Sequence, residues 1–148
     1  MTDEAFLAAF ERCELTKSDW THAAHVRVGW LFLAKSPSFE IALARVRLAI
    51  QRFNLTVLDK PTGYHETITH AFLRLILARC AECAATDFAV FRSKNLDLFD
   101  SQALAKHYSK DVLGSSQARR EFVPPDLEPL PEIPGAPDKV SASSLKMW

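Results

Sequence analysis

Residues 62–70 read TGYHETITH and open the most apolar helical run of the chain. The apolar residues in and behind this stretch recur every three or four positions, as they do along one face of a helix: Ile68, Phe72, Leu75, Ile76 and Leu77. Pro61 and Gly63 belong to a predicted loop over residues 54–64. The pattern therefore predicts a long central helix over about residues 65–84.

Three further long helices are predicted before this run, over about residues 3–15, 21–35 and 37–53. The second and third begin at residues that favour a helix start, such as Thr21 and Pro37. The sequence has neither the alternation of a half-buried strand nor an internal repeat. It therefore predicts an all-α fold, a helical bundle of four long helices.

Shorter helices are predicted over residues 86–93, 101–107 and 111–120, the last of them broken by Gly114. Six of the eight prolines fall after residue 123, where they exclude a helix. We therefore expect a single helical domain over residues 1–121 and a proline-rich tail over residues 122–148. The tail should run extended over the surface or be disordered, and residues past Gly135 should be dispensable for folding.

The composition argues against several classes of partner. The 148 residues suffice for one core, and 18 basic side chains balance 18 acidic ones without a basic patch, so no nucleic-acid partner is expected. No apolar run approaches the roughly 18 residues of a membrane span, and the acidic N-terminus lacks the pattern of a signal peptide. Three cysteines without a disulfide spacing fit a reducing compartment. We expect a cytoplasmic protein with no membrane partner, and the sequence leaves a homo-oligomer open.

Four of the five histidines fall into two short windows. His22 and His25 are three residues apart, so on a helix their rings point about 60° apart and share one face. His65 and Glu66 stand at the start of the central helix, where an irregular first turn lets the imidazole ring face the earlier helix. His70 points about 140° away from His65. Because an intervening antiparallel helix returns the chain to the same end of the bundle, we expect His22, His25, His65 and Glu66 to share one cavity.

Imidazole and carboxylate groups on facing helices are the usual ligands of zinc and non-haem iron in helical bundles. The cluster therefore predicts zinc or iron bound by His22, His25 and His65, with Glu66 as a fourth ligand or as the general base for metal-bound water. In one alternative the histidines are independent and serve as helix caps or hydrogen-bonding groups. In another, an organic ligand occupies a pocket lined by Trp20, Trp30, Phe32 and Tyr64.

Three stretches carry a resemblance to a known family: WTHAAHVRVGWLFL, GYHETITHAFLRL and HYSKDVLGSSQARREFVPPDLEPLP. They resemble a family of small uncharacterised bacterial all-helical proteins with THxxH and YHETIT motifs, over most of the chain from Trp20 to Pro131. The motif positions that carry over are His22, His25, Tyr64, His65, Glu66, Thr67, Thr69, Tyr108, Ser109, Arg119 and Asp126. His70 and His107 depart from the pattern. The resemblance supports the site and assigns no reaction to it.

These patterns favour a metal-binding protein or a metal-dependent enzyme in which Glu66 is catalytic. A non-enzymatic helical interaction module and a small-molecule-binding protein are the alternatives. Tyr64 and Arg119 are expected to bind a small-molecule substrate, with Arg119 contacting an anionic group. The alternative for Arg119 is a surface ion pair with Glu121 or Asp126.

Overall fold

The computed structural model describes residues 1–133, and all regular structure in this range is helical. The three longest helices are α2 (His22–Lys35), α3 (Phe39–Phe53) and α4 (Glu66–Glu82). The shorter helices are α1 (Asp3–Glu11), α5 (Phe88–Lys94), α6 (Lys110–Leu113) and α7 (Ser116–Arg120), with single helical turns at Lys17–Asp19, Asn54–Leu58 and Leu96–Phe99. The all-α prediction is confirmed for this part of the chain.

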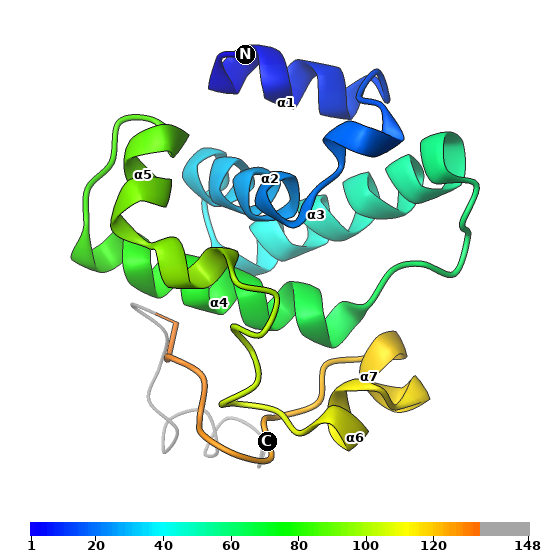
Figure 1. Cartoon of the computed structure of the whole chain (residues 1–148), viewed down its shortest axis with the longest axis vertical. Helices are drawn as coiled ribbons and strands as arrows, with labels where there is room; N and C mark the ends of the chain where they lie inside the picture. Colours follow the sequence, from blue (N-terminus) through cyan, green and yellow to red (C-terminus); the bar gives the residue numbers. More distant parts are fainter. Residues whose placement is uncertain (134–148) are drawn as a thin grey trace, which may run out of the picture.

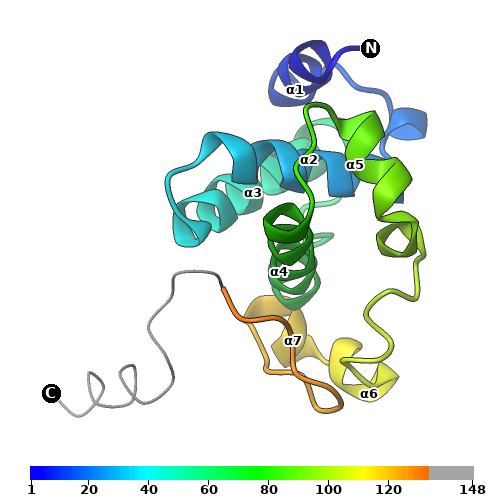
Figure 2. The ribbon, with the colours of Figure 1, turned by 90° about the vertical axis from the view of Figure 1, so that its left-hand side faces the viewer.

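The helices are stacked in layers, as Figures 1 and 2 show from two directions. Helices α2 and α3 form a hairpin in the middle layer, with α1 on one side of it and α4 crossing on the other. Helix α7 packs against α4 on the face that points away from the hairpin. Helix α4 therefore lies between two layers, which agrees with the central position predicted for it. Among residues 1–133, no helix combines the length and apolar content that crossing a membrane requires.

Side-chain caps fix where the long helices begin. The Thr21 hydroxyl accepts a hydrogen bond from the Ala24 amide at 3.2 Å and so caps α2. His65 caps α4 in the same way, because its Nδ1 accepts from the Ile68 amide at 3.1 Å. Each cap satisfies an amide that has no partner within the helix. The caps keep the starts of α2 and α4 within one residue of their predicted positions.

Helices α2 and α4 approach closely at Gly29. A Cβ atom at this position would lie 3.0 Å from Leu73 Cδ2 and 3.1 Å from Ile76 Cδ1, both on α4. A glycine in the middle of a buried helix predicts space beside it for a neighbouring helix or a ligand. The ends of the Leu73 and Ile76 side chains occupy part of that space, and Gly29 also lines a hollow between the long helices.

The apolar spacing of α3 and α4 predicts that Val46, Ala49, Phe72 and Ile76 are nearly fully buried, which is confirmed for two of them and wrong for the other two. Val46 and Ile76 are only 2% and 1% exposed, as expected for the inner faces of α3 and α4. Ala49 and Phe72, which were predicted to be nearly fully buried, are only partly buried. Phe72 lies on the wall of a hollow between the long helices, which leaves part of its ring accessible.

Three local predictions, of one helix end, one loop and one short helix, are wrong. The first helix ends at Glu11 instead of residue 15, because Cys13 adopts a left-handed backbone conformation with φ of 58°. The chain continues from α3 into a π-helical turn, Asn54–Leu58, where a loop was predicted, and the turn ends at the left-handed Asp59. Residues 101–107 form turns and no α-helix, since their backbone hydrogen bonds mostly join residues three apart.

Residues 122–133 contain no helix and pack against α4. The Arg74 guanidinium on α4 donates two hydrogen bonds to the Pro131 carbonyl, at 2.8 and 2.6 Å, and Leu130 is buried. Residues 122–133 are therefore fastened to the domain by specific contacts. The prediction that residues past Gly135 are dispensable concerns positions outside the described residues.

Candidate functional site

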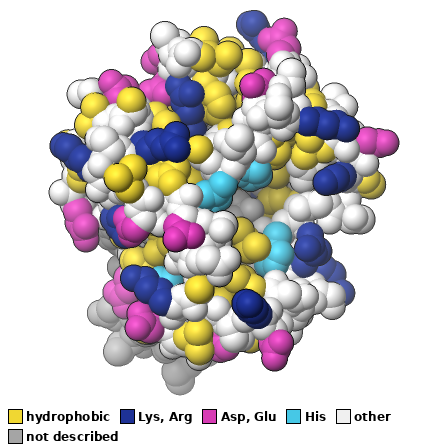
Figure 3. All heavy atoms as spheres, in the orientation of Figure 1, with side chains coloured by type: hydrophobic (Ala, Val, Ile, Leu, Met, Phe, Trp, Pro, Cys, Tyr) yellow, Lys and Arg dark blue, Asp and Glu magenta, His cyan; other side chains and the backbone are white. Residues whose placement is uncertain are grey.

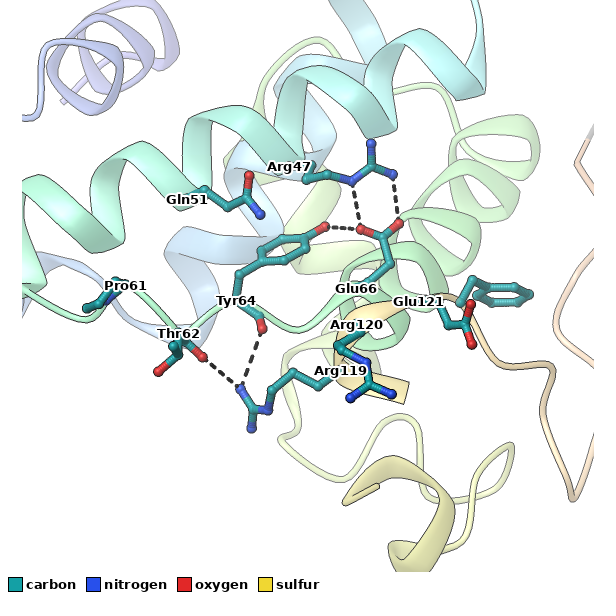
Figure 4. Close-up of a pocket in the computed structure, with 10 residues that line it drawn as sticks. Arg47, Gln51, Pro61, Thr62, Tyr64, Glu66, Arg119, Arg120 and Glu121 are labelled. Atoms are coloured by element: carbon teal, nitrogen blue, oxygen red, sulfur yellow. Dashed lines mark hydrogen bonds and ion pairs between the residues drawn. The ribbon is translucent and has the colours of Figure 1, made fainter. Parts of the chain in front are cut away.

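Two hollows lie beside the N-terminal half of α4. The first, which we call the histidine pocket, has a volume of about 330 Å³ and lies between α2, α3 and α4. Its lining consists of His22, His25, Val26, Gly29, Val46, Ile50, Ile68, Thr69, Phe72, Leu73 and Ile76. The second, which we call the arginine cleft, has a volume of about 580 Å³. It is lined by Arg47, Gln51, Pro61, Thr62, Tyr64, Glu66, Arg119, Arg120, Glu121 and Phe122 (Figure 4).

The two histidines of the histidine pocket are held by backbone carbonyl groups. His22 Nε2 lies 3.0 Å from the Leu98 carbonyl oxygen, and His25 Nδ1 lies 2.7 Å from the Thr21 carbonyl oxygen. A carbonyl only accepts, so these two nitrogens carry the hydrogens. No other hydrogen bond within residues 1–133 involves either ring. The other ring nitrogens, Nδ1 of His22 and Nε2 of His25, have no hydrogen-bond partner within residues 1–133.

His25 lies at the mouth of the pocket against an aromatic cluster. Its ring centroid is 3.9 Å from that of Trp20, which stacks on Phe10 at 5.0 Å. Desolvation by the surrounding protein lowers the pKa of His25, and the nearby His22 lowers it further, against the opposing effect of the Thr21 carbonyl. His25 is therefore neutral at neutral pH. Figure 3 shows histidine rings beside apolar side chains around a hollow on this face.

Glu66 forms part of the wall of the arginine cleft. It accepts hydrogen bonds from Arg47 Nε at 2.7 Å and Arg47 Nη2 at 2.8 Å, and a third from the Tyr64 hydroxyl at 2.9 Å (Figure 4). Burial raises the pKa of Glu66, but these hydrogen bonds outweigh it, and the pKa lies below its ordinary value. Burial raises the pKa of the Tyr64 phenol. Glu66 is therefore an ionised carboxylate with three donors, and Tyr64 keeps its proton.

Arg119 lies at the edge of the same cleft. Its Nη1 points at the carbonyl oxygens of Thr62 and Tyr64, at 3.4 and 3.5 Å (Figure 4). The ion pairs considered for it, with Glu121 or Asp126, are not formed within residues 1–133. Nη1 thus holds the guanidinium group beside the loop before α4, and its other donors have no partner within residues 1–133.

His65 faces neither hollow. Its Nδ1 caps α4, and its Nε2 donates to the Leu113 carbonyl oxygen at 2.8 Å. Both nitrogens are therefore engaged with backbone groups, which matches the capping role that the sequence left open as an alternative. His70 stacks on Phe122 with ring centroids 3.8 Å apart and also lies outside the histidine pocket.

The four predicted ligands are thus divided. His22 and His25 share the histidine pocket, Glu66 belongs to the arginine cleft, and His65 is a helix cap. Within residues 1–133, no group of three or more His, Cys, Asp or Glu side chains is arranged to hold a metal ion. In this arrangement the predicted set does not fit zinc or iron, because His65 has no free lone pair and Glu66 is already paired with Arg47. A metal ion remains a prediction, and we derive no chemistry through it.

Several motif residues fasten the C-terminal segment to the rest of the fold. The Thr67 hydroxyl donates to the Glu121 carbonyl at 2.8 Å, and the Tyr108 hydroxyl donates to the Val123 carbonyl at 2.6 Å. Asp126 accepts from the backbone amide of Ser109 at 2.9 Å. These contacts place α7 and residues 121–123 beside α4, and so they shape one side of the arginine cleft.

Sequence reasoning missed Arg47, the partner of Glu66. Arg47 lies off the apolar stripe of α3, where side chains usually face solvent, and it is 19 positions from Glu66 in the sequence. The aromatic residues proposed to line one ligand pocket are also dispersed. Tyr64 lines the arginine cleft, while Trp20, Trp30 and Phe32 line neither the cleft nor the histidine pocket.

Comparison with protein-family models, with curated proteins and with solved structures gives no match to this chain. The resemblance to a bacterial family therefore stays a prediction.

Proposed function

We propose that the protein binds a small, largely apolar molecule in the histidine pocket, where His22 and His25 accept hydrogen bonds from its polar end. The observation that carries the proposal is the pair of imidazole nitrogens without a partner within residues 1–133 on the wall of a mostly apolar hollow. Pockets that hold small molecules commonly combine mostly apolar walls with a few polar groups that orient the ligand. In this proposal α2, α3 and α4 of the predicted helical bundle serve as the walls.

The size and lining of the pocket restrict the ligand. A volume of about 330 Å³ is at the lower end of the range for ligand pockets, so it suits a molecule of one ring or a short chain. Val26, Val46, Ile50 and Ile76 offer it no hydrogen bond, and burying apolar surface against them is the main source of affinity. The ligand therefore needs an apolar body that fits between α3 and α4.

The two histidines restrict the polar end. His25 has a lowered pKa and is neutral at neutral pH, so its Nε2 accepts a hydrogen bond and carries no charge that would attract an anion. His22 Nδ1 is a second acceptor on the same wall. The matching group on the ligand is a donor such as a phenolic or alcoholic hydroxyl.

The test uses 4-methylphenol as a probe and compares two tryptophan variants. Ile68→Trp places a large ring in the pocket, whereas Ile41→Trp adds the same ring at an exposed position of α3 that lines neither hollow. We expect binding, measured by calorimetry and by NMR shifts of the His25 ring, that is lost in Ile68→Trp and kept in Ile41→Trp. His25→Ala should weaken binding by about twofold to tenfold, the effect of one hydrogen bond. Equal binding by both tryptophan variants, or no shift at the His25 ring, would refute the proposal.

A metal-centred function is the competing prediction. Zinc or iron present in stoichiometric amount in protein purified without a histidine tag, and lost in both His22→Ala and His25→Ala, would favour that function over an organic ligand. It would also require the His65 ring to leave the Leu113 carbonyl if three histidines are to bind one ion.

A further inference from the structure

The arginine cleft contains positively charged side chains that form no ion pair within residues 1–133. Arg47 is neutralised by Glu66, whereas neither Arg119 nor Arg120 forms an ion pair within residues 1–133. Glu121 is the other acidic residue of the lining, and Gln117 donates to its carboxylate at 3.1 Å. Two guanidinium groups thus stand against one unpaired carboxylate at the lower side of the cleft in Figure 4.

The position of Arg119 is set by its surroundings. Contacts of Nη1 with the Thr62 and Tyr64 carbonyls hold the guanidinium beside the loop that precedes α4. Both arginines belong to the last turn of α7, and α7 is joined to α4 through the Thr67 hydroxyl. The backbone that carries both guanidinium groups is therefore held in place, so less conformational entropy is lost when these groups bind a ligand.

The cleft also has a flat, apolar wall next to these charged groups. The Tyr64 ring lies between Gln51 on α3 and Arg119 on α7 (Figure 4), and its hydroxyl is bonded to Glu66. Pro61 and Phe122 line the cleft as well. Because the Tyr64 hydroxyl is engaged by the Glu66 carboxylate, the phenol ring is fixed in orientation and can stack on a planar group.

We propose that the arginine cleft is a binding site for a small aromatic oxyanion, whose anionic group contacts Arg119 and Arg120 and whose ring packs on Tyr64. Guanidinium groups match carboxylate and phosphate oxygens in geometry and charge, and arginine is the residue most suited to such recognition. The volume of about 580 Å³ accommodates a single aromatic ring with its charged substituent. The site is separate from the histidine pocket, and this inference does not rest on the function proposed there.

The experiment titrates the full-length protein with phenyl phosphate and with inorganic phosphate, followed by calorimetry and by NMR of the arginine side chains and the Tyr64 ring. We expect phenyl phosphate to bind more tightly than inorganic phosphate and to shift the signals of Arg119, Arg120 and Tyr64. Arg119→Ala and Arg120→Ala should each weaken phenyl phosphate binding about tenfold or more, the effect of losing a charge-assisted hydrogen bond. Both side chains are exposed, so neither change threatens the fold.

Lys94→Ala is the matched control, because it removes one exposed positive charge at the end of α5 and does not touch the cleft. The control should bind phenyl phosphate as the unchanged protein does. If all three variants weaken phenyl phosphate binding equally, the ligand is attracted by positive charge in general, and the proposed site is refuted. Inorganic phosphate binding as tightly as phenyl phosphate would overturn the role of the aromatic wall, and phenyl phosphate that shifts no cleft signal would overturn the proposal as a whole. Ile68→Trp separates the two proposals, since it should leave phenyl phosphate binding intact.

Discussion

Replacing Arg47 by methionine should lower the free energy of unfolding by about 2 kcal/mol at pH 7. The change removes both donors of the Arg47–Glu66 pair and leaves a carboxylate that keeps only the hydrogen bond from Tyr64. Breaking a fully buried ion pair from one side costs about 3 to 5 kcal/mol. The Arg47 side chain is 38% exposed and that of Glu66 only 10%, so water replaces part of what is lost and the cost is smaller.

The pH dependence identifies the carboxylate as the cause. The pKa of Glu66 in the folded protein lies below the ordinary value of 4.5, so the stability that its ionised form contributes is present above pH 4.5 and is lost as the pH falls through the folded pKa. Without Arg47, burial still disfavours the ionised form of Glu66, and the Tyr64 hydrogen bond remains to favour it. Protonation of Glu66 in the variant therefore removes much of the loss of stability. The stability difference between the two proteins should therefore be full at pH 7 and shrink on acidification below about pH 4.5.

Urea unfolding followed by circular dichroism, repeated between pH 3 and pH 7, measures this difference. Arg45→Met is the control on the same helix, because the hydrogen bonds of exposed Arg45 within residues 1–133 go to the Ser36 hydroxyl and the Lys35 carbonyl. This change should cost no more than about 0.5 kcal/mol. A double change of Arg47 and Glu66 to methionine should recover most of the loss, because no charge is then left unpaired. A loss below 0.5 kcal/mol, or one that does not change with pH, would refute the reasoning.

Three further predictions concern the core, a titration and metal content. Gly29→Val should lower the free energy of unfolding by about 1 to 3 kcal/mol in urea titrations, because its side chain would collide with Leu73; no loss would mean that α2 and α4 are further apart than described. His70 should titrate by NMR with a pKa of about 4, since burial and the charge of Arg74 disfavour its protonated form; a midpoint near 6.5 would place the ring in water. Elemental analysis of untagged protein should find less than one equivalent of zinc or iron, because the predicted ligands are divided between different sites; a full equivalent would contradict this arrangement.

The sequence alone determined the all-helical class and the starts of the long helices. Thr21 and His65 cap helices through bonds to amides three residues further on, and this spacing is visible in the sequence. Helical periodicity also placed Val46 and Ile76 in the core. These features depend on residues close together in the chain, so their physical causes can be read without knowing how the helices pack. After residue 100 the helix predicted over residues 101–107 is absent, whereas the predicted break at Gly114 matches the gap between α6 and α7.

Only the tertiary structure decided which side chains meet. His22 bonds to the Leu98 carbonyl, 76 residues away, and Glu66 pairs with Arg47 instead of the histidines predicted to accompany it. Clustering in the sequence predicted that His22, His25, His65 and Glu66 share one cavity, and the structure divides them between two hollows and a helix cap. Clustering could not predict that His65 would cap α4 with Nδ1 and bond to the Leu113 carbonyl with Nε2. Nor could it predict that His22 and His25 would line one hollow and Glu66 another. Such partners are set by the crossing of the helices and by the path of the chain after α4, since groups remote in sequence meet only when packing brings their backbones together.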